Sequence, residues 1–247
     1  MKRTIISGIL VLVLSLAIVS GTSAADATFG GDFNSAYIWR GMTFNDGLVF
    51  QPSIDVSHKG FGINIWGNLD IDDYNDTLNS GEFSEIDMTL SYSFDIQKLS
   101  VSLGYIEYVF SAGVEGTREV FVSLGLDIYK GLTAGLNLYY DVDEIDDIYA
   151  TATLGYSLPI GEKFTLDLQA LAGYAGKDFA RAYGGTDGGF NEYVFSATGT
   201  YTIIENLSVS AYLNYTGAID DDVLPDVNSG GLQDVDFFGG VGIYYSF

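Results

Sequence analysis

The chain has 247 residues, no cysteine and a formal net charge of −23, from 33 acidic and 10 basic residues. These values exclude disulfides, thiolate metal sites and a lipid-anchored cysteine, and they disfavour binding to nucleic-acid phosphates. Nevertheless 47% of the residues are hydrophobic, with 31 Gly, 18 Tyr and 16 Phe. A chain so rich in aromatic and aliphatic residues is not expected to be disordered.

Residues 1–25 read as a secretory signal peptide. Lys2 and Arg3 give it a positive start, and the apolar run over residues 5–19 is broken only by serine and glycine. Small residues in "GTSAAD" then offer a cleavage site. A single transmembrane anchor is the lesser alternative, because a membrane-spanning helix needs about 20 apolar residues.

Cleavage is expected after Ala24 or Ala25, which leaves residues 26–247 as the mature domain. The loss of two basic residues takes the formal net charge from −23 to −25. No later stretch is apolar for about 20 residues, so the mature domain is predicted to contain no transmembrane helix.

From residue 26 onward the dominant spacing of apolar residues is two, as in "LTAGLNLYY" (132–140) and "LSVSAYLNY" (207–215). This spacing is typical of strands with one apolar and one polar face. The pattern predicts twelve strands, over residues 28–40, 47–57, 61–71, 83–94, 99–109, 118–129, 132–141, 148–158, 163–175, 191–203, 207–217 and 234–247.

The connections between these segments alternate between short turns, such as "HKG" and "KG", and longer loops rich in Asp, Gly and Asn. Alternation places all short turns at one end of the sheet and both termini beside them. The sequence therefore predicts a 12-stranded antiparallel up-and-down transmembrane β-barrel of the outer membrane. A secreted β-sandwich is the alternative, but it gives no reason for alternating loop lengths or for aromatic residues at strand ends.

In such a barrel the apolar face meets lipid and the polar face meets the lumen. The leucines predicted to face lipid are Leu124, Leu126, Leu136, Leu138, Leu154, Leu166 and Leu168. The predicted pore-lining residues are Asp32, Arg40, Asp55, Asp70, Glu85, Asp87, Glu119, Asp127, Asp141, Asp167 and Asp236. In the first strand, four aromatic residues share the predicted lipid face: Phe29, Phe33, Tyr37 and Trp39.

Two positions predict irregular strands. Pro52 cannot donate a ladder hydrogen bond, and Glu107 interrupts an apolar face, so a bulge or strand end is expected there. A twelve-stranded lumen is intermediate between a filled and a water-filled one. Its carboxylates would attract cations if it is open. In the alternative, the same acids form a hydrogen-bonded network with Arg40 and close the lumen.

Three acidic loops, over residues 70–76, 141–147 and 218–226, could attract calcium, but none has the spacing of an EF-hand. A solvated acidic rim is the simpler interpretation. Catalysis is not expected, because the only histidine, His58, lies in a short turn and triads or histidine metal sites lack their residues. We predict no catalytic residue, metal or cofactor.

The stretch "SAYIWRGMTFNDGLVFQPSIDVSHKGFGINIWGNLD" (35–70) resembles the opening of the TorF-type porin family, which carries the Gcw_chp domain. The matching residues are Ser35, Tyr37, Arg40, Gly41, Gly60, Phe61, Trp66 and Gly67. The resemblance implies a porin of the proteobacterial outer membrane and assigns no catalytic residue. Twelve-stranded porins for acidic oligosaccharides line their lumen with arginine, so an anionic sugar is disfavoured for this acidic chain.

Two functions follow as hypotheses. The first is a passive outer-membrane channel for small solutes that prefers cations. The second is a closed structural or adhesive barrel whose acidic external loops bind divalent cations, surface lipid or a partner. Either way the expected partners are outer-membrane lipid and the assembly machinery, which would recognise Tyr245 and Phe247 at the C-terminus.

Overall fold

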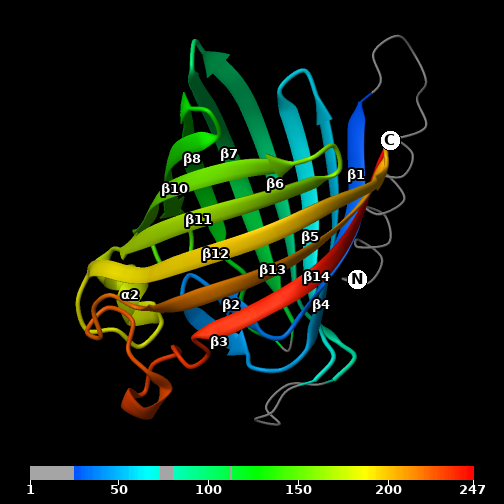
Figure 1. Cartoon of the computed structure of the whole chain (residues 1–247). Coiled ribbons are helices and arrows are strands. Elements are labelled where there is room, and N and C mark those ends of the chain that lie inside the picture. The colour runs from blue at the N-terminus through cyan, green and yellow to red at the C-terminus, as the bar shows by residue number, and fades with distance from the viewer. Residues whose placement is uncertain (1–24, 73–79, 112) are drawn as a thin grey trace.

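The computed structural model describes residues 25–72, 80–111 and 113–247. Twelve antiparallel strands form a closed barrel in which each barrel strand pairs with the next one along the chain (Figure 1). The predicted 12-stranded up-and-down transmembrane barrel is therefore confirmed. The predicted signal peptide lies outside the described residues, apart from Ala25.

The barrel strands are β1 (Asp26–Asn34), β4 (Val49–His58), β5 (Phe61–Asp70), β6 (Phe83–Ile96), β7 (Leu99–Phe110), β8 (Arg118–Tyr129), β9 (Leu132–Asp141), β10 (Ile148–Ile160), β11 (Phe164–Ala175), β12 (Gly189–Ile204), β13 (Leu207–Ala218) and β14 (Phe237–Ser246). The remaining elements are β2 (Tyr37–Trp39), β3 (Met42–Asn45), the helix α2 (Lys177–Ala182) and the 3₁₀ turn η1 (Val227–Ser229). Among the described residues, no helix is long and apolar enough to cross a membrane. The predicted strand boundaries differ from these by a few residues, except in the first strand.

The barrel closes where its first and last strands meet. β1 pairs with β14 on one side and with β4 on the other. Beyond the ladder, Ala27 and Phe247 exchange two backbone hydrogen bonds, of 3.0 and 2.9 Å. The seam thus extends to the last residue, and the sheet has no unpaired edge.

Large apolar side chains cover the outside of the barrel. Phe29, Leu136 and Val241 are each more than half exposed, at 57, 57 and 56%. Five of the leucines predicted to face lipid are among the exposed residues: Leu126, Leu136, Leu138, Leu154 and Leu168. An apolar surface of this extent is stable against lipid and not against water.

The predicted first strand, residues 28–40, is wrong beyond Asn34, where β1 ends. The chain then enters the barrel, and Tyr37 is only 6% exposed while Trp39 is half-buried. Neither ring faces lipid, contrary to the prediction. The period-two pattern continues because β2 is also a strand, but it is a strand of an internal hairpin, and periodicity alone cannot distinguish the two.

Pro52 disturbs β4 as predicted. Pairing with β5 is present at Phe50 and again at Ser53, but is interrupted at Pro52 without a change of register. The missing N–H of proline explains the gap. Glu107, in contrast, causes no bulge against β6, and the strand ladder with β8 ends there, opposite Arg118.

Candidate functional site: a plug and two cavities in the lumen

β2 and β3 form a hairpin at the end of the barrel that carries the long loops, beside α2 (Figure 1). In outer-membrane barrels that end is external. The turn between the strands is made by Arg40 and Gly41, with φ angles of 53° and 78°. Positive φ at both positions is what a two-residue type I′ turn requires. The turn places Arg40 inside the lumen.

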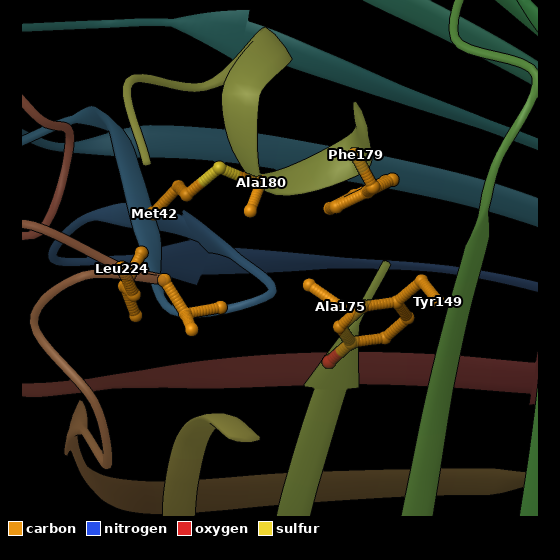
Figure 2. Close-up of a cluster of buried hydrophobic side chains, with 7 residues drawn as sticks. Met42, Tyr149, Ala175, Phe179, Ala180 and Leu224 are labelled. Atoms are coloured by element: carbon orange, nitrogen blue, oxygen red, sulfur yellow. The ribbon is translucent and has the colours of Figure 1, made fainter. Parts of the chain in front are cut away.

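The hairpin is covered by segments from distant parts of the chain. Figure 2 shows side chains from the hairpin, α2, a long loop and the barrel strands β10 and β11 gathered in one cluster: Met42, Tyr149, Ala175, Phe179, Ala180 and Leu224. We call the hairpin (residues 37–45), α2 and residues 223–224 the plug. Burial of each large apolar side chain contributes about 1.5–3 kcal/mol. The main apolar core of this barrel therefore lies within its long-loop end.

Arg40 fastens the hairpin to the barrel wall. Its Nη1 and Nη2 donate to the two carboxylate oxygens of Glu119 on β8, at 2.7 and 2.6 Å. The two side chains are 6% and 2% exposed. Tyr108 of β7 donates a third hydrogen bond to Glu119, at 2.8 Å. Both charges are thus compensated although they are removed from water.

Aromatic rings surround the guanidinium of Arg40. Its Cζ lies 4.2 Å from the ring centre of Trp39, 4.1 Å from that of Tyr149, 4.8 Å from that of Tyr139 and 5.1 Å from that of Phe179. Burial alone would lower the pKa of Arg40, but the charge of Glu119 outweighs it and raises that pKa above its ordinary value. The hairpin therefore holds a permanent positive charge.

A second contact fixes the start of β2. The hydroxyl of Tyr37 donates to Glu85 Oε2 of β6, at 2.8 Å. Burial, followed by the charge of Glu85, raises the pKa of Tyr37 well above its ordinary value. The phenol therefore keeps its proton and remains a hydrogen-bond donor.

The far end of the hairpin joins a chain of side-chain hydrogen bonds along the wall. Asn34 donates to Gln51, Gln51 to Asn68, and Asn68 to Asp70, over 2.7, 2.9 and 2.9 Å. Asn45 of β3 donates to the same Asp70 oxygen, at 2.7 Å. The network connects β1, β4 and β5 with the hairpin, so the start and the end of the hairpin are both tied to the wall.

The turn itself is held from the opposite wall by β12. Asn191 Nδ2 donates to the backbone oxygen of Arg40, at 2.9 Å, and to Glu192 Oε2, at 2.6 Å. Tyr149 donates to the other oxygen of Glu192. A Cβ on Gly41 would lie 2.6 Å from Leu224 and 2.9 Å from Glu192, so the turn fits only with glycine there.

The helix α2 is short but well anchored. Asp147 Oδ2 accepts from the backbone N–H groups of Asp178 and Phe179, at 2.7 and 3.0 Å, in the first turn. Tyr183, which follows the helix, packs its ring against Phe179 at 5.1 Å between centres. Burial raises the pKa of Tyr183 to about 12. The helix thus presents Phe179 to Arg40 from the loop side.

Two cavities, of about 480 and 280 Å³, lie beside the hairpin. Both are lined by Ile38, Trp39, Trp66, Asp87 and Phe238. The larger one also extends along the wall to Asn64, Thr89, Asn137 and Thr151. The long-loop half of the lumen therefore contains residual space lined by aromatic and polar side chains.

The short-turn half of the lumen is lined by small residues. Pairing places the lumenal side chains of neighbouring strands side by side, as in Ser93 and Ser102, whose hydroxyls are 3.0 Å apart. The same face continues through small residues on the next strands: Ser123, Gly125, Gly135, Thr153 and Gly155. Tyr212 on β13 and Tyr244 on β14 are larger exceptions on the lumenal face, and the hydroxyl of Tyr244 donates to Asp32 of β1.

The predicted pore-lining residues fall into groups. Four are buried near the long-loop end: Asp70, Glu85, Glu119 and Asp141. The others on barrel strands are half-buried or exposed: Asp32, Asp55, Asp87, Asp127 and Asp167. Arg40 lies in the hairpin, and Asp236 lies in the loop before β14.

The buried acids have structural partners. Asp141 accepts from Thr117 at 2.6 Å and from the backbone N–H groups of Asp143 and Ile145 at 2.9 and 3.1 Å. Asp70, Glu85 and Glu119 bind the hairpin, as described above. These four acids hold the plug and its surrounding loops, and the role of the others in lining a pore stays a prediction.

Sequence reasoning missed Glu192 and the aromatic residues around Arg40. Glu192 shares the spacing of Val194, Ser196 and Thr198, which would have placed it in the lumen. The rings of Tyr139 and Tyr149 alternate with lipid-facing residues in the same way. No local signal identifies Phe179, because its partners lie far away in the sequence.

The acidic loops do not come together as a metal site. Within residues 25–72, 80–111 and 113–247, no group of three or more His, Cys, Asp or Glu is placed to hold a metal ion. Most of the predicted acidic loop 70–76 lies outside those residues. His58 ends β4 in the short-turn half, well separated along its strand from the plug.

The barrel is similar to solved porin structures. A KdgM porin in complex with disordered oligogalacturonate matches with a TM-score of 0.53 and 12% identity, over 90% of this chain and 99% of that one. A NanC porin matches with a TM-score of 0.51 and 15% identity, over 90% of this chain and 98% of that one. No family model and no curated protein matches in sequence. At these identities the likeness shows the fold alone, which is that of twelve-stranded porins.

Proposed function

We propose that the protein is an outer-membrane, porin-like channel for the passive diffusion of small solutes, and that it prefers cations. The closed barrel with an apolar outside supports the membrane location, and the small polar residues of the short-turn half support an aqueous space. The resemblance of residues 35–70 to the TorF-type porin family is in keeping with this proposal.

The charge of the lumen carries the proposal. Of the eight Lys and Arg residues that the structure describes, only Arg40 is buried inside the barrel, and Glu119 neutralises it. The other seven lie in turns or in α2, or, at Arg118, at the start of β8. Asp55, Asp127 and Asp167 have no ion pair among the described residues. A lumen with unpaired carboxylates raises the local concentration of cations.

The plug limits what can pass. It reduces the space at the long-loop end to cavities of about 480 and 280 Å³, which fit small solutes and exclude polymers. Passage would follow the wall beside Trp39 and Trp66, and the short-turn half would act as a vestibule.

Reconstitution into a planar bilayer tests this function. We expect stepwise conductance and, in a potassium chloride gradient, a reversal potential on the cation-selective side. The double variant Asp127→Asn, Asp167→Asn should reduce this selectivity, whereas Asp221→Asn, an exposed loop residue with the same change of charge per site, should not. Anion selectivity, or equal effects of both variants, would contradict the proposal.

A second function is favoured by the number of contacts that fix the plug. A barrel closed at Arg40 and Tyr37 could serve as a structural or adhesive protein whose acidic loops attract divalent cations, surface lipid or a partner. This function predicts no conductance from the native protein or from the Arg40→Ala variant, together with retention on vesicles of anionic surface lipid only when calcium is present.

A further inference from the structure

A carboxylate lies between two aromatic rings on the lumenal face. Asp87 of β6 is paired in the ladder with Trp66 of β5 on one side and with Tyr108 of β7 on the other. Directly paired residues of neighbouring strands point to the same face of the sheet. Trp66, Asp87 and Tyr108 therefore form a row across the wall, and all three line the larger cavity.

The hairpin adds two more rings to this row. The ring centre of Tyr37 lies 5.5 Å from that of Trp66, and the ring centre of Trp39 lies 5.9 Å from that of Tyr108. Asp87 and Trp39 line both cavities. The carboxylate is thus enclosed by rings from the wall and from the hairpin, with open space on its lumenal side.

Asp87 has no counter-charge in the part of the chain that the structure describes. None of the ion pairs there involves Asp87, and the nearby Arg40 uses both terminal nitrogens for Glu119. The Oδ1 atom of Asp87 is buried without a hydrogen-bond partner. The side-chain partner of Asp87 is a second acid, Glu85, two residues earlier on the same face of β6. Ionising two adjacent acids that are largely removed from water is costly, and a cation supplied from outside would reduce that cost.

We propose that the cavity beside Asp87 binds the alkylammonium group of a small organic cation. Asp87 supplies the counter-charge, and the faces of Trp66, Tyr108 and Trp39 attract the ammonium group through cation–π interactions. A volume of about 480 Å³ lies in the range of small-molecule pockets. The ring faces around Asp87 favour an alkylated cation over a hydrated metal ion, because a ring face has no oxygen to replace the water of a metal ion. This site rests on the proposed channel function and deepens it by naming a solute class.

The two tryptophans of the chain, Trp39 and Trp66, both line the cavity, so tryptophan fluorescence reports on this site alone. The experiment titrates the detergent-folded mature protein with choline and, separately, with its neutral isostere 3,3-dimethylbutan-1-ol. We expect a saturable fluorescence change with choline and at least tenfold weaker binding of the isostere. Equal binding of the two probes, or no saturable change, would overturn the proposal without any need for a variant.

A pair of variants tests the carboxylate. Asp87→Asn should weaken choline binding at least tenfold, whereas Asp221→Asn in an external loop should leave it within a factor of two. Heat-modifiable migration on a detergent gel confirms that each variant is folded. Unchanged choline binding by folded Asp87→Asn would overturn the site. Binding in detergent does not depend on conductance. Saturable choline binding by a protein that shows no conductance would therefore refute the proposed channel function and support the proposed binding site.

Discussion

Arg40 and Glu119 are 79 residues apart in the sequence and meet in the lumen as a bidentate ion pair, with N–O distances of 2.7 and 2.6 Å. One belongs to an early hairpin and the other to a barrel strand. Because both are buried, loss of either partner leaves an uncompensated charge, which typically costs about 3–5 kcal/mol. This pair is therefore the contact on which the position of the hairpin depends most.

Replacement of Arg40 by alanine should release the hairpin and widen the channel. The variant loses the ion pair and the stacking on Tyr149, so we expect a larger single-channel conductance and faster amide exchange in residues 37–45. The ion pair of Arg118 with Glu107 and Asp143 is half exposed, so solvent screens it and it should contribute little to stability. Arg118→Ala should therefore leave both measurements unchanged, and a similar effect of the two variants would refute the special role of Arg40.

Gly41→Ala should displace the hairpin through sterics alone. The new Cβ would lie 2.6 Å from Leu224, in a residue that also has a positive φ of 78°. Gly81 is a matched control, because its φ is 81° and a Cβ added there would meet no atom within 4 Å. Both substitutions carry the backbone cost of about 1–2 kcal/mol, but only Gly41→Ala should speed amide exchange in the hairpin. If Gly81→Ala had the same effect on the hairpin, packing around Gly41 would not be the cause.

High pH should loosen the plug. The pKa of Tyr183 is raised to about 12 and that of Tyr37 is raised well above its ordinary value, against about 10 in an unfolded chain. A raised pKa means that the neutral phenol stabilises the folded plug below about pH 10, and this contribution is lost as the pH rises towards 12. We expect conductance to increase between about pH 10 and 12. The variant Tyr37→Phe, Tyr183→Phe should lack most of this increase, and a pH response that persists in it would contradict the assignment.

Deletion of Phe247 should impair assembly more than it alters any pore. The residue exchanges two backbone hydrogen bonds with Ala27 at the seam, and its ring contacts Tyr245 at 6.0 Å between centres. We expect a reduced yield of heat-modifiable barrel in the outer-membrane fraction and a normal conductance from the molecules that do fold. Phe237→Ser, an exposed aromatic at the opposite end of β14, is the control, and an equal loss of yield there would argue against a terminal assembly signal.

Most of the barrel could be predicted from the sequence because its strands obey a local rule. In β9 and β13, lipid-facing and lumen-facing residues alternate without a break, and short turns such as Lys130–Gly131 mark the strand ends. The hairpin was not predicted, because Tyr37 and Trp39 continue the alternation of β1 and were therefore assigned to the first barrel strand. The only local sign was Arg40–Gly41, which resembles the other turns of basic residue and glycine, Lys59–Gly60 and Lys130–Gly131.

The candidate site was harder to predict, for a different reason. Periodicity identified Glu119 and Asp87 as lumenal residues. It did not predict that Arg40 pairs with Glu119, or that Asp87 has no counter-charge among the residues that the structure describes. Those outcomes depend on where the hairpin and α2 lie, which is decided by packing within the buried cluster that contains Met42, Phe179 and Leu224. A one-dimensional pattern contains no information on such long-range contacts.

The position of the hairpin also constrains the order of folding. The hairpin connects β1 to β4. β1 also pairs with β14 to form the seam that closes the barrel. The hairpin is synthesised early, whereas its anchors on β8 and β12 follow much later, and the last bond of the seam awaits the final residue of the chain. Insertion of the hairpin and closure of the sheet thus both involve β1, and a barrel that closed before the hairpin had entered would leave the plug outside the lumen.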